Sequence, residues 1–186
     1  DGIPDLPGQL LYCSATTAPD RGTPDGFHER RSDRTITFAI RQVLDAEAPV
    51  HIDLLVKRVA AGWGITRLSP RVQERVMALI PAGTVRTGDA RNRVFLWRPD
   101  QDPNRHAGFR VPNPRETFVR EAEHIPPQEV ANVMHELLKD HLSFHKDDLL
   151  RATAAVFGIR RVGSRVRQSM EDGLEHYQRT QSQRES

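Results

Sequence analysis

A single cysteine, Cys13, stands among 186 residues, which excludes both an internal disulfide framework and a zinc site built from cysteines. The aromatic fraction is 6%, the hydrophobic fraction is 37% and 13 residues are proline, so part of the chain must be arm or linker rather than core. No apolar run approaches the roughly 18 residues of a membrane span. We therefore expect a cytoplasmic protein without membrane contact.

The sequence patterns typical of catalysis and metal binding are also missing. There is no glycine-rich phosphate loop and no recognised Ser/His/Asp arrangement. His135-Glu136 resembles the start of a zinc-protease motif, but the second histidine would have to stand where Lys139 is. His141 and His145 lie four residues apart in an expected turn, and no cysteine or carboxylate completes a site. We expect no catalytic residue, no metal and no cofactor.

The most informative feature that is present is an internal repeat. Residues 50–72 recur as residues 144–166, at a constant offset of 94 positions. Ten identities fall within the 22 positions that begin at His51, where composition alone gives roughly one or two. The identities include a glycine pair and two arginine pairs that matter below: Gly64 with Gly158, Arg67 with Arg161, and Arg71 with Arg165. The chain therefore uses one supersecondary unit twice.

Basic residues concentrate in this repeated unit, although the net charge is only +2. Between Leu54 and Gln73 there are four basic residues and no acid. Between Leu149 and Met170 there are five arginines and no acid. Such acid-free clusters favour an anionic partner.

Apolar periodicity predicts helices separated by proline and glycine signals. Ile36, Ala39, Ile40, Val43 and Leu44 line one face of a first helix, which Ser32 or Asp33 can cap. Asp53 is expected to cap the second, and Ser69 with Pro70 begins the third. Val85 and Val94–Trp97 flank a Gly/Asp/Asn turn and predict a β-hairpin. The expected helices span about 34–46, 53–63, 70–80, 127–139, 147–157 and 164–177.

Helix, short strand, helix, turn, helix and hairpin is the element order of a winged helix. The predicted fold is therefore mainly α, with tandem winged-helix or helix-turn-helix units, the first with a hairpin wing and the second wingless. We expect the chain, which starts without methionine, to be a piece of a longer protein. The expected divisions are an extended arm (1–31) packing through Leu10, Leu11 and Tyr12, a winged-helix unit (32–98), a Pro-rich linker (99–124), a second helix-turn-helix unit (125–178) and a polar tail (179–186).

The candidate DNA-binding residues are arginines of the third helices and of the hairpin. In a helix-turn-helix the helix after the turn lies in the major groove, and an arginine fork bonds two acceptors of a phosphate or guanine. The alternative is an ordinary solvated face or a structural role. Trp63 and Phe157 are either stacking platforms for single strands or, more commonly, core residues. The candidates are Arg67, Arg71, Arg75, Arg86, Arg91, Arg93, Arg160, Arg161 and Arg165.

Two segments carry a family resemblance: Ala48-Pro49-Val50-His51-Ile52-Asp53, and Arg58-Val59 followed by Trp63-Gly64-Ile65-Thr66-Arg67. They resemble a domain of unknown function near the C-terminus of large bacterial superfamily 1 helicase proteins. These proteins often also carry a very-short-patch-repair-type nuclease domain. The resemblance covers about residues 35–175, with Gly158-Ile159-Arg160-Arg161 as its second, weaker copy. It implies an accessory domain that acts on DNA and assigns no catalytic residue here.

Two functions remain open from the sequence. The first is a non-catalytic accessory module that contacts DNA, with low sequence specificity, within a helicase/nuclease protein. The second is a docking or dimerisation module whose arginines pair with acids of the parent's motor domains or of a partner. The distinguishing observation is whether the arginines are exposed or buried in salt bridges.

Overall fold

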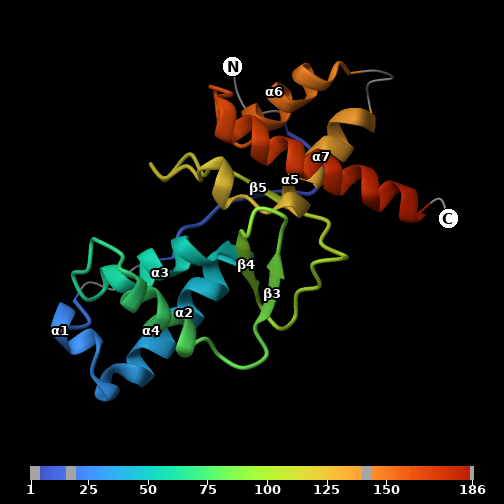
Figure 1. Cartoon of the computed structure of the whole chain (residues 1–186). Helices are drawn as coiled ribbons and strands as arrows, with labels where there is room; N and C mark the ends of the chain where they lie inside the picture. The colour runs from blue at the N-terminus through green and yellow to red at the C-terminus, as the bar shows by residue number, and fades with distance from the viewer. Residues whose placement is uncertain (1–4, 16–19, 140–143, 185–186) are drawn as a thin grey trace. The chain divides into compact units, whose positions relative to one another are not determined.

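The computed structural model describes residues 5–15, 20–139 and 144–184, and these are mostly helical with small sheets (Figure 1). The chain forms two compact units. The first, here called the hairpin unit, is Cys13–Asp102, and the second, the long-helix unit, comprises Asp1–Tyr12 and Pro103–Ser186. Each unit contains one copy of the repeat.

From residue 33 onward the hairpin unit follows the predicted order of elements, but two short helices lie before it in the stretch that was expected to be an extended arm. The face of its first long helix is buried as the periodicity predicted, with Ile36 and Ile40 fully inaccessible. The two largest side chains of its core, Trp63 and Trp97, are also inaccessible to solvent. The elements are α1 (Pro24–Phe27), η1 (Arg30–Ser32), α2 (Asp33–Glu47), β2 (Val50–His51), α3 (Ile52–Ala61), α4 (Pro70–Ala78), β3 (Val85–Gly88) and β4 (Val94–Trp97).

The predicted hairpin is confirmed, and it belongs to a three-stranded antiparallel sheet of order β2-β4-β3. Val85 pairs with Trp97 at one end of the hairpin, and Gly88 pairs with Val94 at the other. Asn92 adopts a φ of 58° in the connecting turn, a left-handed conformation that asparagine tolerates. β4 buries Phe95, Leu96 and Trp97, so the sheet closes the helical core.

Of the N-caps predicted for α3 and α4, the one for α4 is confirmed and the one for α3 is wrong. Ser69 caps α4, since its hydroxyl oxygen accepts a hydrogen bond from the Val72 backbone N–H at 3.4 Å. The expected cap at Asp53 is wrong, because α3 begins one residue earlier, at Ile52. His51 is the N-cap instead, and its Nδ1 accepts from the Asp53 backbone N–H at 3.1 Å. Ser32 precedes α2 but makes no capping bond through its side chain.

Among its described residues, the long-helix unit contains three α-helices, one 3-10 helix and a two-stranded parallel sheet. In this sheet Gln9–Leu11 pairs with Phe109–Val111. Met134, Leu150 and Phe157 lie in its core. The elements are β1 (Gln9–Leu11), β5 (Phe109–Val111), η2 (Ala122–His124), α5 (Pro127–Lys139), α6 (Lys146–Val156) and α7 (Ser164–Arg184).

Three expected boundaries differ from the structure. Residues 9–11 of the expected arm form strand β1, and Tyr12 is buried while Leu10 and Leu11 are 62% and 51% exposed, so packing through the leucines is wrong. The expected linker 99–124 contains β5 and η2, because Arg110 and Arg120 bond to the buried Glu129 of α5. The expected tail continues α7 to Arg184, since no proline or glycine follows Gly173 to end the helix.

The repeat is visible in the described structure as well as in the sequence. The helix pairs α2 and α5, α3 and α6, and α4 and α7 each start 94 residues apart. Gly64 and Gly158 follow the second helix of each copy with φ values of 70° and 77°. After each glycine the next N–H donates back to an alanine carbonyl, from Ile65 to Ala60 at 3.2 Å and from Ile159 to Ala154 at 3.0 Å. The two copies therefore end this helix in the same way.

Candidate nucleic-acid interface

The turn between α3 and α4 presents two arginines to solvent. Arg67 lies in the turn, and Arg71 lies in the first turn of α4, where Ser69 and Pro70 fix the start of the helix. Both side chains are exposed. Neither forms a hydrogen bond or an ion pair with any residue that the structure describes. Two guanidinium groups at this helix start are therefore available to an external acceptor.

The equivalent turn of the long-helix unit repeats this arrangement. Arg160 and Arg161 lie between α6 and α7, and Arg165 lies in the first turn of α7. All three are exposed, and within the described parts of the chain they have no hydrogen-bonding or ionic partner. Arg161 and Arg165 occupy the positions that Arg67 and Arg71 occupy in the first copy. Both copies thus have a pair of arginines at the same place, and these arginines have no intramolecular partner among the described residues.

A side-chain bond at equivalent positions holds each third helix against the start of the second. Gln73 Nε2 donates to Asp53 Oδ1 at 3.2 Å, and Arg167 NH2 donates to Asp147 Oδ1 at 2.6 Å. The hydrogen bond from Arg167, and then its charge, lower the pKa of Asp147 below its ordinary value. The role of Asp147 is therefore to position α7, and Arg167 is engaged within the fold.

Arg75 is held within the hairpin unit. Its Nε donates to the Phe27 carbonyl at 3.2 Å, and its NH2 donates to the Glu29 carbonyl at 2.8 Å and to Asp33 Oδ1 at 2.5 Å. The side chain is only 18% exposed. Arg75 thus ties α4 to the first residue of α2 and to the segment before it. No local sequence pattern indicates this role, because the partners lie more than 40 residues earlier.

The three hairpin arginines separate into two exposed side chains and one buried side chain. Arg86 on β3 and Arg91 in the turn are exposed. Arg93 is 8% exposed, and its Nε lies 2.6 Å from Asp89 Oδ2. The same guanidinium lies over the Phe95 ring at 5.8 Å from the centroid. Arg93 therefore braces the hairpin, and Arg86 and Arg91 are the basic groups that it presents outward.

The basic run of α3 is also partly neutralised by a tertiary contact. Arg58 Nε lies 3.1 Å from Glu47 Oε2, and the Glu47 side chain is fully buried. An acid-free stretch of sequence is therefore not acid-free in space. The sequence cannot show this, because Glu47 belongs to the preceding helix.

The remaining sequence candidates take structural places. Trp63 and Phe157 are 1% and 2% exposed, which confirms them as core residues rather than stacking platforms. Glu136 pairs with Lys139 at 2.7 Å, in the position where a zinc protease would need a histidine. His141 lies outside the described residues. Among the residues that are described, no group of three histidines, cysteines or acids is arranged to hold a metal ion.

Comparison with known proteins gives one match. A family of proteins of unknown function, DUF3320, matches residues 25–74. This stretch runs from α1 into α4 and includes Arg67 and Arg71. No curated protein and no solved structure matches the chain. Within the described residues, no helix has both the length and the apolar character that crossing a bilayer requires.

Proposed function

We propose that the chain is a non-catalytic accessory module that binds DNA through the arginines at the start of the third helix in each repeat. One observation carries this proposal. Arg67 and Arg71 in one copy, and Arg161 and Arg165 in the other, are exposed and unpaired among the described residues. A merely structural arginine would have an intramolecular partner, as Arg75 does. Arginines kept solvated twice at the same place favour an external anion.

The position of these arginines suits a duplex backbone. In helix-turn-helix proteins the third element enters the major groove, and residues at its N-terminal end meet phosphates or base edges. The helix N-terminus adds partial positive charge and free N–H groups at the same point. Planar guanidinium groups then bond two phosphate oxygens at once. Such contacts position the protein without reading sequence, so low sequence specificity is expected.

A winged-helix architecture for the hairpin unit forms part of this proposal. Its support is the order α2, β2, α3, α4, β3 and β4, together with the sheet order β2-β4-β3. A hairpin in this place gives a second arm for contacts beside the groove. Arg86 and Arg91 are the exposed basic side chains on it. The long-helix unit has the extended helix α7 at the place of α4 and acts as the second helix-turn-helix copy.

We further propose that the module serves a larger helicase/nuclease protein in DNA repair or defence. The match to a family of unknown function over residues 25–74 assigns no activity, so this setting rests on the sequence resemblance alone. As a tethered domain, the module would benefit from a high local concentration of DNA at the motor. Weak isolated binding is sufficient for such a role.

A second candidate function is docking to a protein, and the outer face of α2 favours it. Phe38 is 56% exposed there, between the exposed residues Arg34 and Arg41. The Arg21 guanidinium lies 5.6 Å from the centre of its ring. An exposed aromatic side chain among cations suits an acidic protein surface. This face is separate in sequence from the third-helix arginines, so both functions can coexist.

The proposal is tested by titrating the chain into duplex, forked and single-stranded DNA at about 50 and about 200 mM salt. With roughly four to six phosphate contacts, affinity should fall on the order of a hundredfold or more between these concentrations, because each contact releases counterions. Binding that is absent at high micromolar concentration, or that does not respond to salt, would favour the docking function instead.

A further inference from the structure

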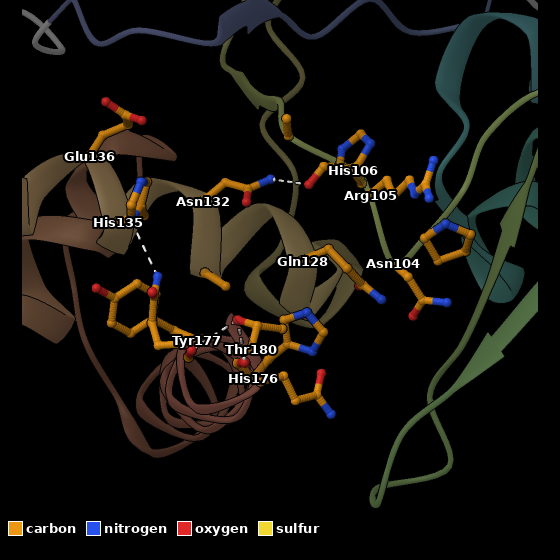
Figure 2. Close-up of a pocket in the computed structure, with 15 residues that line it drawn as sticks. Asn104, Arg105, His106, Gln128, Asn132, His135, Glu136, His176, Tyr177 and Thr180 are labelled. Carbon is orange, nitrogen blue, oxygen red and sulfur yellow. Dashed lines mark hydrogen bonds between the residues drawn. The ribbon is translucent and has the colours of Figure 1, made fainter. Parts of the chain in front are cut away.

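The long-helix unit contains a groove whose lining suits a small ligand. This groove is separate from the arginines at the start of the third helices. It encloses about 400 Å³ and lies between the loop 103–107, α5 and α7. Figure 2 shows Asn104 and His106 on the loop, Gln128 and Asn132 on α5, and Tyr177 on α7. Its volume falls within the roughly 300–1,000 Å³ of small-molecule sites.

The lining is mostly polar, and its two charged residues, Arg105 and Glu136, have opposite signs. His106 and His176 are in the groove, and burial lowers the pKa of each below its ordinary value, so both are neutral near pH 7. The rings of His135 and Tyr177 lie 6.1 Å apart, centre to centre. Amides and a hydroxyl supply most of the other polar groups: Gln128, Asn132, Thr180 and Gln181. Such a lining disfavours a lipid, and neutral imidazoles add no charge to hold an anion.

Two acceptor oxygens in this groove have no donor among the described residues. Gln128 Oε1 is buried and accepts no hydrogen bond. Asn132 gives its Nδ2 to the His106 and Gly108 carbonyls, at 2.9 Å each, so its Oδ1 remains as an acceptor. The two residues are four apart on α5 and so lie on one face. A buried acceptor without a donor is costly, which indicates a place where a ligand donor belongs.

We propose that this groove binds a nucleobase, with an exocyclic amino group donating to Gln128 and Asn132. A nucleobase is planar, uncharged and bears both donors and acceptors on its edge, and proteins hold unstacked bases by edge hydrogen bonds and aromatic contact. Adenine and cytosine have an amino group whose two hydrogens can serve both oxygens, whereas thymine has a single ring N–H on its edge and can serve only one. The groove therefore selects amino-bearing bases over thymine.

The base can belong to a free nucleotide or to a nucleic-acid strand. In the second case the inference rests on the proposed function, and α7 connects the two sites. Arg165 and His176 are 11 residues apart on this helix, which is about three turns and roughly 16 Å along its axis. They therefore lie on the same side of α7. At about 3.4 Å or more per nucleotide, this distance spans at most about five nucleotides of one strand.

The test is a ligand-observed NMR titration of the whole chain with adenosine, cytidine, thymidine and ribose. Adenosine and cytidine should bind at least roughly tenfold more tightly than thymidine, which is about the effect of one hydrogen bond, and ribose should not bind. Equal binding of thymidine, equal binding of ribose, or no nucleoside binding up to millimolar concentration would overturn the proposal.

A variant pair locates the binding. Gln128→Met keeps the side-chain length and removes the unpartnered oxygen, so its melting temperature should equal or exceed that of the parent while nucleoside affinity falls roughly tenfold. Gln178→Met, at an exposed position of α7 outside the groove, should bind as the parent does. Unchanged nucleoside affinity in Gln128→Met would overturn the assignment. Because the nucleoside comparison uses the unaltered chain, the proposal stays testable if this variant misfolds.

Single-stranded oligonucleotides separate this inference from the proposed function. An adenine-rich strand should bind more tightly than an equally long thymine strand, and Gln128→Met should abolish that preference without changing the salt dependence. Salt-dependent binding with no base preference would contradict the nucleobase site and remain consistent with DNA binding by the arginines. Nucleoside binding without any salt-dependent DNA binding would support the nucleobase site and contradict DNA binding by the arginines.

Discussion

The two copies of the repeat share their helix starts and their glycine turns, yet they complete their cores in different ways. The hairpin unit ends α4 at Ala78 and closes its core with the sheet β2-β4-β3. The long-helix unit instead extends the equivalent helix, α7, to Arg184 and packs it along α5. Gly173 permits this approach, because a Cβ there would lie 2.1 Å from Val130 Cγ1. A three-helix motif thus needs an additional layer, and a hairpin or a longer helix can supply it.

The copies also differ in how polar groups are buried. Glu129 of α5 is fully buried and bonds to Arg110 and Arg120, whereas the equivalent position in α2 is Thr35, which is exposed. The Arg120 guanidinium also lies 4.6 Å from the centre of the Tyr12 ring. This network joins β5, the loop after it and the residue following β1 to α5. It replaces the sheet contacts that secure the hairpin unit.

The largest expected effect comes from removing this network's acid. Glu129→Ala should lower the free energy of unfolding by about 3–5 kcal/mol, because two buried guanidinium groups lose their counter-charge. Thr35→Ala, at the equivalent exposed position, should change stability by less than about 0.5 kcal/mol. Urea unfolding of both variants measures the difference. Similar, small effects in the two variants would mean that the buried network does not secure the long-helix unit.

The same carboxylate predicts the acid sensitivity of this unit. Burial raises the pKa of Glu129, but the charges of Arg110 and Arg120 and their hydrogen bonds lower it more, so it lies far below the ordinary 4.5. Its contribution to stability is therefore complete above about pH 4.5 and is lost as pH falls toward the folded-state pKa. Measured below that pH, the parent should lose stability more steeply than Glu129→Ala does.

An intermediate effect should distinguish the two glycine turns. A Cβ added at Gly64 would meet open space, whereas a Cβ added at Gly158 would lie 2.6 Å from Pro112 Cγ. Gly64→Ala should cost about 1–2 kcal/mol for its left-handed backbone alone. Gly158→Ala should cost about 1–3 kcal/mol more because Pro112 has to move. Thermal unfolding of the two variants gives the comparison, and equal losses would show that Pro112 yields without cost.

Much of this fold follows from sequence pattern, but its tertiary closures do not. The apolar spacing in α2, the Ser69-Pro70 start and the turn before β4 are each predicted from neighbouring residues. β1 and β5 are not, because each is three residues long and their pairing joins Gln9 to Phe109, which are separated in sequence by the whole hairpin unit. The continuation of α7 is not predicted because residues 178–184 lack apolar periodicity.

The candidate interface shows the same limit. The alignment of the two copies identifies Arg67 and Arg71 together with Arg161 and Arg165, and the structure leaves these exposed. Arg75 on the third helix and Arg93 on the hairpin are also candidates from the sequence, but Asp33 and Asp89 engage them. Whether an arginine is available depends on which acid folds next to it. Sequence reasoning does not find the nucleobase groove, since its residues come from three separate segments.

The smallest expected effect concerns the bond that orients each third helix. Arg167→Gln gives the long-helix unit the same pair that Gln73 and Asp53 form in the hairpin unit. The pKa of Asp147 should rise toward its ordinary value, because the hydrogen bond and the charge of Arg167 now lower it. NMR titration of the Asp147 carboxyl carbon follows this change, with little effect on melting temperature expected at an exposed pair. An unchanged pKa would show that Arg167 does not hold Asp147 in solution.

The most direct test of the central proposal is the salt dependence of DNA affinity in Arg71→Ala/Arg165→Ala, compared with Arg34→Ala/Arg41→Ala. Both double variants remove two positive charges from exposed positions, the first from the third helices and the second from α2. If the repeated arginines contact phosphates, the slope of log affinity against log salt should decrease by about two in the first variant and stay at the parent value in the second. Parent-like binding by Arg71→Ala/Arg165→Ala, or equal losses in both variants, would contradict the proposal.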